Sequence, residues 1–156
     1  MGDPGPPPDD RTIPGEAYDL FLDGRRLLAE RKPAEAAAAL ERALALAPGF
    51  HSITELLGRA YYAGRRYDDA AEQFTAAVER DPADDYAHFA LALTLLKQGR
   101  PAVAAGHLRM ALAMRPGNEE YRRALRRAEL ARRNGPAGNE HTNGHTNGHT
   151  EENGHG

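Results

Sequence analysis

The sequence predicts an all-α protein built from three copies of one helical hairpin. Pro48, Pro82 and Pro116 follow one another at steps of 34 residues. Other positions keep the same step: Ala36, Ala70 and Ala104; Ala43, Ala77 and Ala111; Leu40, Phe74 and Leu108; Leu27, Tyr61 and Leu95; Gly24, Gly58 and the near-equivalent Ala92. A constant period of this length indicates a stack of supersecondary units, each burying its apolar face against its neighbours.

Each unit divides into two stretches whose apolar residues recur at helical spacing. The three units are residues 17–50, 51–84 and 85–118. The breaks between the paired helices fall at residues 31–33, 64–66 and 99–101. In these breaks glycine is expected to end one helix and proline to open the next. The sequence therefore predicts six helices in three hairpins.

Small side chains recur in this pattern for a physical reason. Helices approach closely only where neither side chain is large, and a larger residue fills the adjoining gap. The alanine at position 70, for example, alternates with Phe74 and then with Ala77. We therefore expect the recurring alanines and the residues between them to form the core.

Residues 119–133 predict one more amphipathic helix after the third unit. Its apolar face would carry Tyr121, Ala124, Leu125, Ala128 and Ala131, with most of its arginines opposite. A solenoid needs a terminal helix with a polar outer side to cover its last unit. We expect this helix to be the cap.

Both ends of the chain differ in composition from the repeats. Residues 1–16 are rich in proline and acid, and residues 134–156 are rich in His, Thr, Asn and Gly. Neither has enough apolar surface to offset the entropy of ordering. Both are predicted to be disordered tails around an ordered domain at residues 17–133.

The repeated residues resemble the tetratricopeptide repeat family, over about three quarters of the chain. The second unit matches the family pattern best, with Leu57, Gly58, Tyr61, Ala70, Phe74, Ala77 and Pro82. The resemblance implies a right-handed α-solenoid of helix-turn-helix units. It also implies a non-enzymatic interaction module, such as an adaptor, a scaffold or a co-chaperone-like protein.

In this family the first helices of successive units line a concave groove that receives a peptide or a helix. The resemblance places these residues in the groove: Tyr18, Phe21, Arg25 and Leu28; Ser52, Glu55, Arg59 and Tyr62; Tyr86, Phe89, Leu93 and Lys97. Such a groove suits an amphipathic helix or an apolar peptide, with Tyr62, Tyr86 and Phe89 as anchors. Arg25 and Arg59 would pair with acids of the partner. The alternative is that several of these rings only pack between adjacent units.

Relatives that hold the C-terminal carboxylate of chaperones use lysines and asparagines as a clamp. Phe21, Glu55 and Phe89 stand where the resemblance would place clamp residues. We therefore do not expect that activity here.

Several classes of chemistry find no support in the sequence. The absence of cysteine excludes disulfides, thiolate zinc sites and a cysteine nucleophile, and no phosphate-binding glycine motif occurs. Adjacent acids at 68–69, 84–85 and 119–120 lie near predicted helix starts, where they complement the helix dipole. We expect neither an enzyme nor a cofactor.

The net charge of −3 gives no general attraction to nucleic acid or to acidic membranes. Nothing approaches the apolar run of about 18 residues that a membrane span needs, and the acidic, proline-rich start is unlike a secretory signal. We therefore expect a cytoplasmic protein that acts on a protein or peptide partner.

Two alternatives and one further possibility stay open. The tail histidines His141, His145, His149 and His155 are weak candidates for metal binding. The last helix carries a basic stripe, Arg122, Arg123, Arg126, Arg127 and Arg133, which suits an acidic partner or a nucleic acid. Self-association through exposed repeat faces is also compatible with the sequence.

Overall fold

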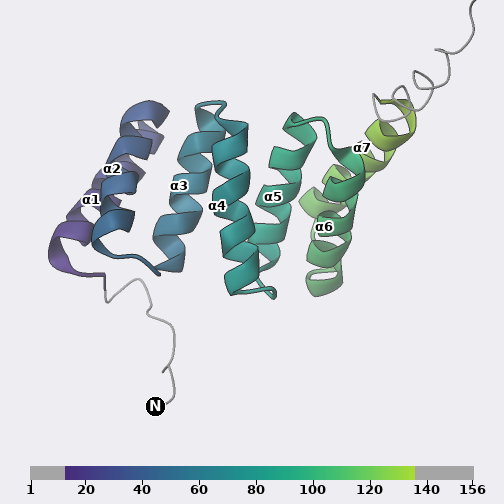
Figure 1. The fold of residues 1–156 in the computed structure, drawn as a ribbon. Helices are drawn as coiled ribbons and strands as arrows, with labels where there is room; N and C mark the ends of the chain where they lie inside the picture. Colours follow the sequence, from purple (N-terminus) through teal and green to yellow (C-terminus); the bar gives the residue numbers. More distant parts are fainter. Residues whose placement is uncertain (1–12, 136–156) are drawn as a thin grey trace, which may run out of the picture.

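The computed structural model describes residues 13–135 and shows an α-solenoid. Within those residues the chain forms seven helices and no strand. They are α1 (Gly15–Ala29), α2 (Pro33–Leu46), α3 (His51–Ala63), α4 (Tyr67–Arg80), α5 (Asp85–Lys97), α6 (Pro101–Met114) and α7 (Glu119–Asn134). Figure 1 shows the helices following one another in chain order along an elongated row. The predicted all-α solenoid of three hairpins and a seventh helix is confirmed.

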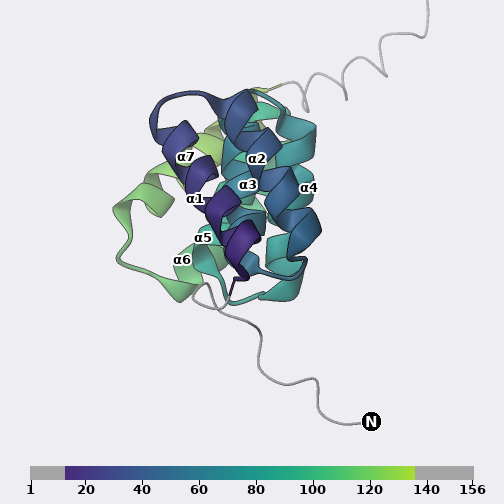
Figure 2. The same ribbon diagram turned by 90° about the vertical axis from the view of Figure 1, so that its left-hand side faces the viewer.

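Packing is mostly between helices that are neighbours in the chain. Each pair α1–α2, α3–α4 and α5–α6 forms a hairpin. The contacts α2–α3 and α4–α5 join one hairpin to the next, and α6–α7 joins the last hairpin to the cap. The first helices also touch one another, α1 with α3, α3 with α5 and α5 with α7. Figure 2 looks along this row from the α1 end. As a result α1, α3, α5 and α7 share one side of the molecule.

The core consists of the residues that recur every 34 positions. Leu40, Phe74 and Leu108 are at most 1% exposed, and the recurring alanines around them are fully buried. The glycines of the first helices make room for these large residues. A Cβ on Gly58 would lie 2.7 Å from the Phe74 ring, and a Cβ on Gly24 would lie 2.5 Å from Leu40. Close helix approach explains why this register holds glycine in two of the units.

The ordered domain begins earlier than the composition suggests. α1 starts at Gly15, and Ile13 is 7% exposed within the apolar core. The predicted tail of residues 1–16 was therefore too long at its inner end, because Ile13 supplies the apolar surface that the proline-rich stretch lacks. Residues 1–12 and 136–156 lie outside the described part of the chain.

The turns within the hairpins share an unusual backbone conformation. Arg31 (φ 63°), Arg65 (φ 64°) and Gly99 (φ 74°) are left-handed, and they are one repeat apart. Gly64 ends α3 as its C-cap, as predicted, with an ordinary φ of −86°. The left-handed residue is the next one, Arg65, whose backbone N–H donates to the carbonyl of Tyr62 at 3.0 Å. The third unit alone has glycine where the geometry favours it.

We predict that Arg65→Gly stabilises the protein by about 0.5–1 kcal/mol. A left-handed conformation costs a residue with a Cβ about 1–2 kcal/mol, and the greater freedom of glycine in the unfolded chain offsets part of that gain. Urea unfolding measures the difference. Arg42→Gly, in the middle of α2, serves as the control and should cost about 1 kcal/mol. A lower unfolding midpoint for Arg65→Gly would refute the prediction.

Candidate functional site

A cavity of about 470 Å³ opens where α1, α3 and α5 meet. We call this cavity the groove. Its walls come from all three units: Arg25, Leu28, Ala29, Leu56, Arg59, Tyr62, Ala63, Phe74, Tyr86, Phe89, Ala90 and Leu93. Such a volume is within the range of ligand-binding pockets in proteins. The groove is therefore the main candidate for a binding site among residues 13–135.

Most of the residues that the family resemblance placed in the groove do line it. Arg25, Leu28, Arg59, Tyr62, Tyr86, Phe89 and Leu93 belong to its wall. Tyr18 is 40% exposed on α1 outside the wall, and Phe21 is buried in the core. Lys97 instead lines a polar hollow that also contains Asp68 and Gln98.

The aromatic residues of the groove fall into two groups. Phe89 is 6% exposed, and its ring centroid lies 4.8 Å from that of Tyr121 on α7. This ring packs between adjacent helices, as the alternative interpretation held, and it is a poor anchor for a partner. Tyr86 is 37% exposed. Tyr62 is half-buried, and its ring packs edge-on against that of Tyr67, with 5.4 Å between the two ring centroids. Tyr62 and Tyr86 are the rings that a partner can reach.

The charge of the groove is positive. Among the residues that line it, the charged ones are Arg25 and Arg59, both exposed. Arg25 also lies over the Phe21 ring, 6.0 Å from its centroid. An apolar wall with two exposed guanidinium groups is suited to a ligand that combines apolar and acidic groups.

A third arginine reaches toward the same side from the cap. Burial raises the pKa of Tyr62, the neighbouring Tyr67 adds to the rise, and Arg127 opposes it. Arg127 of α7 therefore acts electrostatically on a groove residue of α3. In the sequence, Arg127 is recognisable only as part of the basic stripe on the last helix. The repeat step would have revealed the relation, because Arg25, Arg59, Leu93 and Arg127 occupy one register.

Glu55 lies beside the groove in a different environment. Its carboxylate is 3.7 Å from Nε2 of His51, which is itself 2.6 Å from Oδ2 of Asp84. Burial and then the nearby Asp84 raise the pKa of Glu55. Glu55 thus belongs to a cluster at the amino-terminal ends of α3 and α5 rather than to the wall of the groove.

The cap is attached to the third unit as expected. Tyr121, Ala124 and Ala128 are buried, and the Tyr121 hydroxyl donates to Oδ2 of Asp85 at 2.6 Å. Burial alone would raise the pKa of Asp85, but hydrogen bonds from Tyr121 and Arg115 outweigh it and lower that pKa. The predicted capping role of the helix is confirmed, and Asp85 has a structural role in it.

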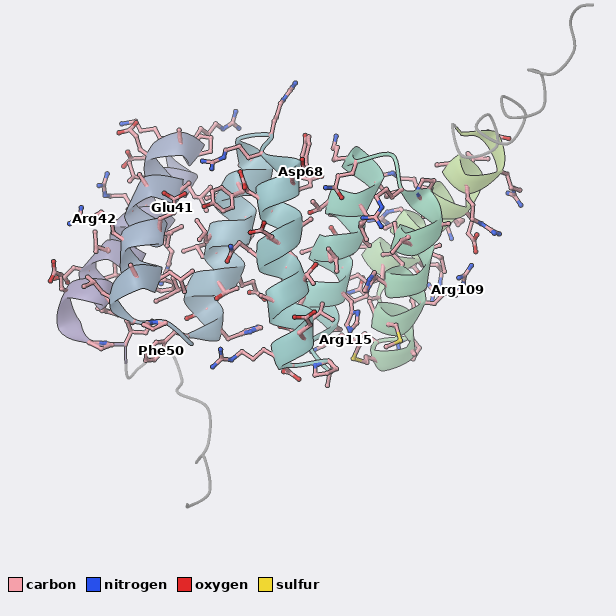
Figure 3. The ribbon with its side chains drawn as sticks, viewed as in Figure 1. Glu41, Arg42, Phe50, Asp68, Arg109 and Arg115 are labelled. Atoms are coloured by element: carbon pink, nitrogen blue, oxygen red, sulfur yellow. The ribbon has the colours of Figure 1, made fainter. Side chains whose placement is uncertain are left out.

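A lateral contact between hairpins recurs with different chemistry. The Tyr61 hydroxyl of α3 donates to Glu41 of α2 at 2.5 Å. Glu41 is labelled in Figure 3. Two repeat steps further along the row, Arg109 of α6, which is labelled in Figure 3, pairs with Glu129 of α7. Burial, together with the hydrogen bond to Glu41, raises the pKa of Tyr61 to about 12. Both pairs join the second helix of a hairpin to the helix that follows it in the chain.

Of the two alternative sites, the basic stripe of α7 lies within the described residues and the tail histidines lie outside them. Arg122 of the predicted basic stripe pairs with Glu119, and the neighbouring Arg132 pairs with Glu129. His141, His145, His149 and His155, the weak metal candidates, lie outside the described residues. No helix within residues 13–135 is long and apolar enough to cross a membrane.

Two histidines of the third unit form a buried contact. His88 is 2% exposed, and its Nε2–H donates to the carbonyl of Pro82 at 2.9 Å. Its Nδ1 therefore accepts from Nδ1–H of His107, at 3.0 Å. Burial, and then the neighbouring His88, lower the pKa of His107. Structural packing in the third unit accounts for this pair.

We predict that this pair makes the protein less stable in mild acid. A histidine whose pKa is lowered by folding binds a proton more readily in the unfolded chain, where its pKa is about 6.5. Stability is therefore lost as the pH falls below that value. The urea midpoint should drop between pH 7.5 and pH 5.5, and the drop should be smaller in His107→Gln. A midpoint that stays constant or rises would contradict the assignment.

A row of helical hairpins with a cavity along its first helices defines a helical-repeat scaffold. The family model of the tetratricopeptide repeat matches residues 21–82 and 55–119. Because these overlapping matches span more than half of the chain, the protein belongs to the tetratricopeptide repeat family, a family of protein-interaction modules. No curated protein matches the chain in sequence.

Several solved structures have the same fold. The first TPR domain of Spaghetti (RPAP3), bound to the HSP90 peptide SRMEEVD, has a TM-score of 0.71 and 18% identity, covering 74% of this chain and 92% of that chain. The Sgt2 TPR domain from Aspergillus fumigatus has the same score and identity, with 96% of each chain covered. MamA AMB-1 has a TM-score of 0.64 and 25% identity, covering 72% and 66%.

Proposed function

We propose that the protein is a non-enzymatic adaptor whose groove binds a short segment of another protein that is both apolar and acidic. The observation that carries the proposal is the composition of the groove wall, in which Tyr62, Tyr86 and several leucines surround Arg25 and Arg59. Aromatic and arginine side chains dominate the binding energy of protein interfaces. The family membership supports the same class of function.

The chemistry of the partner follows from the positions of the charges. Arg25 and Arg59 are one repeat apart, and Arg127 continues their register on α7. A segment lying along the first helices would meet these guanidinium groups in turn, with its apolar side chains against Tyr62, Tyr86 and Leu93. An amphipathic helix with one acidic edge fits this arrangement.

The clamp for a chaperone carboxylate is a different arrangement. The three positions at which the resemblance would place clamp residues hold Phe21, Glu55 and Phe89. Two of these are buried rings, and Glu55 would repel a carboxylate. The proposed partner therefore contributes internal acidic residues rather than a chain terminus.

A selection from a displayed library of random peptides on the full-length protein tests this proposal without knowledge of the partner. We expect the selected peptides to be enriched in Asp and Glu beside Leu, Phe or Trp. Tyr86→Ala should weaken their binding at least tenfold. That loss corresponds to about 1.4 kcal/mol, which is within the usual range for an aromatic anchor.

Tyr18→Ala provides a matched control. Tyr18 and Tyr86 occupy the same register on α1 and α5 and have nearly equal exposure, 40% and 37%. Only Tyr86 lines the groove. Equal effects of the two substitutions, or selected peptides without an excess of acid, would refute the proposal.

A further inference from the structure

Three potential metal ligands converge outside the groove wall, at the junction of the second and third units. His51 and Glu55 are four residues apart on α3, and Asp84 directly precedes α5. Nε2 of His51 lies 2.6 Å from Oδ2 of Asp84 and 3.7 Å from Oε2 of Glu55. One ligand atom from each of the three lies within 4.8 Å of the other two. The packing of α3 against α5 brings together residues 33 positions apart in the chain.

The orientation of these groups is set by their surroundings. Oδ1 of Asp84 accepts a hydrogen bond from the backbone N–H of Ala87 at 3.0 Å, which leaves Oδ2 directed at His51. Nδ1 of His51 is buried and has no hydrogen-bond partner among residues 13–135. The ring therefore makes its polar contacts through Nε2, on the side where the two carboxylates lie. This arrangement places one nitrogen and two oxygen donors around a common point.

We propose that His51, Glu55 and Asp84 bind one divalent transition-metal ion of the Zn²⁺ type. Imidazole and carboxylate are ordinary ligands for this ion, at about 2.0–2.2 Å. Tetrahedral ligand atoms at such distances are about 3.4 Å apart. The separation of His51 from Glu55 is close to that value, and the separation of His51 from Asp84 requires an opening of less than about 1 Å, a small side-chain adjustment.

The surroundings favour a weakly held, accessible ion. The side chains of His51, Glu55 and Asp84 are 31%, 26% and 16% exposed, so solvent can fill the remaining coordination position. The amino-terminal ends of α3 and α5 oppose a cation at this place. The two carboxylates offset that opposition, and we expect affinity in the micromolar range. Because Asp84 is the N-cap of α5, the ion would link α3 of the second unit to the start of the third unit.

The experiment uses the full-length chain with His141, His145, His149 and His155 each changed to Asn, so that the tail supplies no imidazole. Zn²⁺ alone is titrated in by calorimetry. We expect one ion per chain and a higher thermal midpoint with Zn²⁺, because an ion bound only to the folded state stabilises it. His51→Asn should weaken binding at least tenfold.

Two further variants separate ligation from structural damage. Asp84→Asn keeps the side-chain acceptor for Ala87 N–H, and Glu55→Gln keeps the shape of its side chain; both should weaken Zn²⁺ at least tenfold while remaining helical by circular dichroism. Glu35→Gln, in the first turn of α2, is the matched control and should leave the affinity unchanged. The proposal would be overturned if the tail-substituted chain bound no stoichiometric Zn²⁺. It would also be overturned if the Asp84 and Glu55 variants bound Zn²⁺ as tightly as the tail-substituted chain itself.

Discussion

Phe74→Ala should lower the free energy of unfolding by about 3–5 kcal/mol, the typical cost of truncating a buried phenylalanine to alanine. Phe74 is the largest of the fully buried side chains, at 1% exposure. Its ring lies against the backbone of α3 at Gly58, so the surrounding helices cannot readily close over the space it leaves. Since domains of this kind are stable by only about 5–15 kcal/mol, the variant should lose a large part of its stability.

Urea unfolding followed by circular dichroism measures this loss. Val103→Ala on α6 is the control, because Val103 is 44% exposed and surface substitutions usually stay within about 0.5 kcal/mol. A loss below about 1 kcal/mol for Phe74→Ala would mean that the second unit is not packed around this ring.

Arg59→Glu should reduce the affinity for an acidic groove ligand by about 30-fold to 100-fold. The substitution removes one attractive charge pair and introduces a repulsive one, which together are worth about 2–3 kcal/mol in a partly desolvated groove. Fluorescence anisotropy with a labelled peptide from the displayed library measures the change. Binding by the unaltered protein should also weaken as salt is added, because the groove arginines are exposed.

Arg42→Glu is the matched control for this charge reversal. Arg42 is an exposed residue of α2 outside the groove wall (Figure 3), and its replacement changes the net charge of the protein by the same amount. An equal loss of affinity in both variants would assign the effect to overall charge rather than to the groove.

The periodicity of the sequence predicted most of the fold because the same positions are buried in each repeat. Phe74 and Leu108 could be placed in the core from their register alone, and both are buried. The domain start was harder to predict. Ile13 is one apolar residue in a proline-rich stretch, and its burial depends on tertiary contacts that no local pattern reveals.

The binding site was predictable only in part. Helical spacing identified which face of each first helix points toward the groove, but it did not separate the buried Phe89 from the exposed Tyr86. That distinction depends on Tyr121, which α7 places against Phe89. The cluster of His51 with Asp84 was equally hard to predict, because the two residues are 33 positions apart and meet only where α3 packs against the start of α5.

Chemical-shift mapping by NMR of the whole chain with an acidic peptide from the displayed library tests directly whether the groove is the binding site. If the groove is the binding site, saturable shifts should concentrate on the amides of the wall segments, residues 25–29 of α1, 56–63 of α3 and 86–93 of α5. Shifts confined to α2, α4 and α6, or to residues 136–156, would contradict binding in the groove.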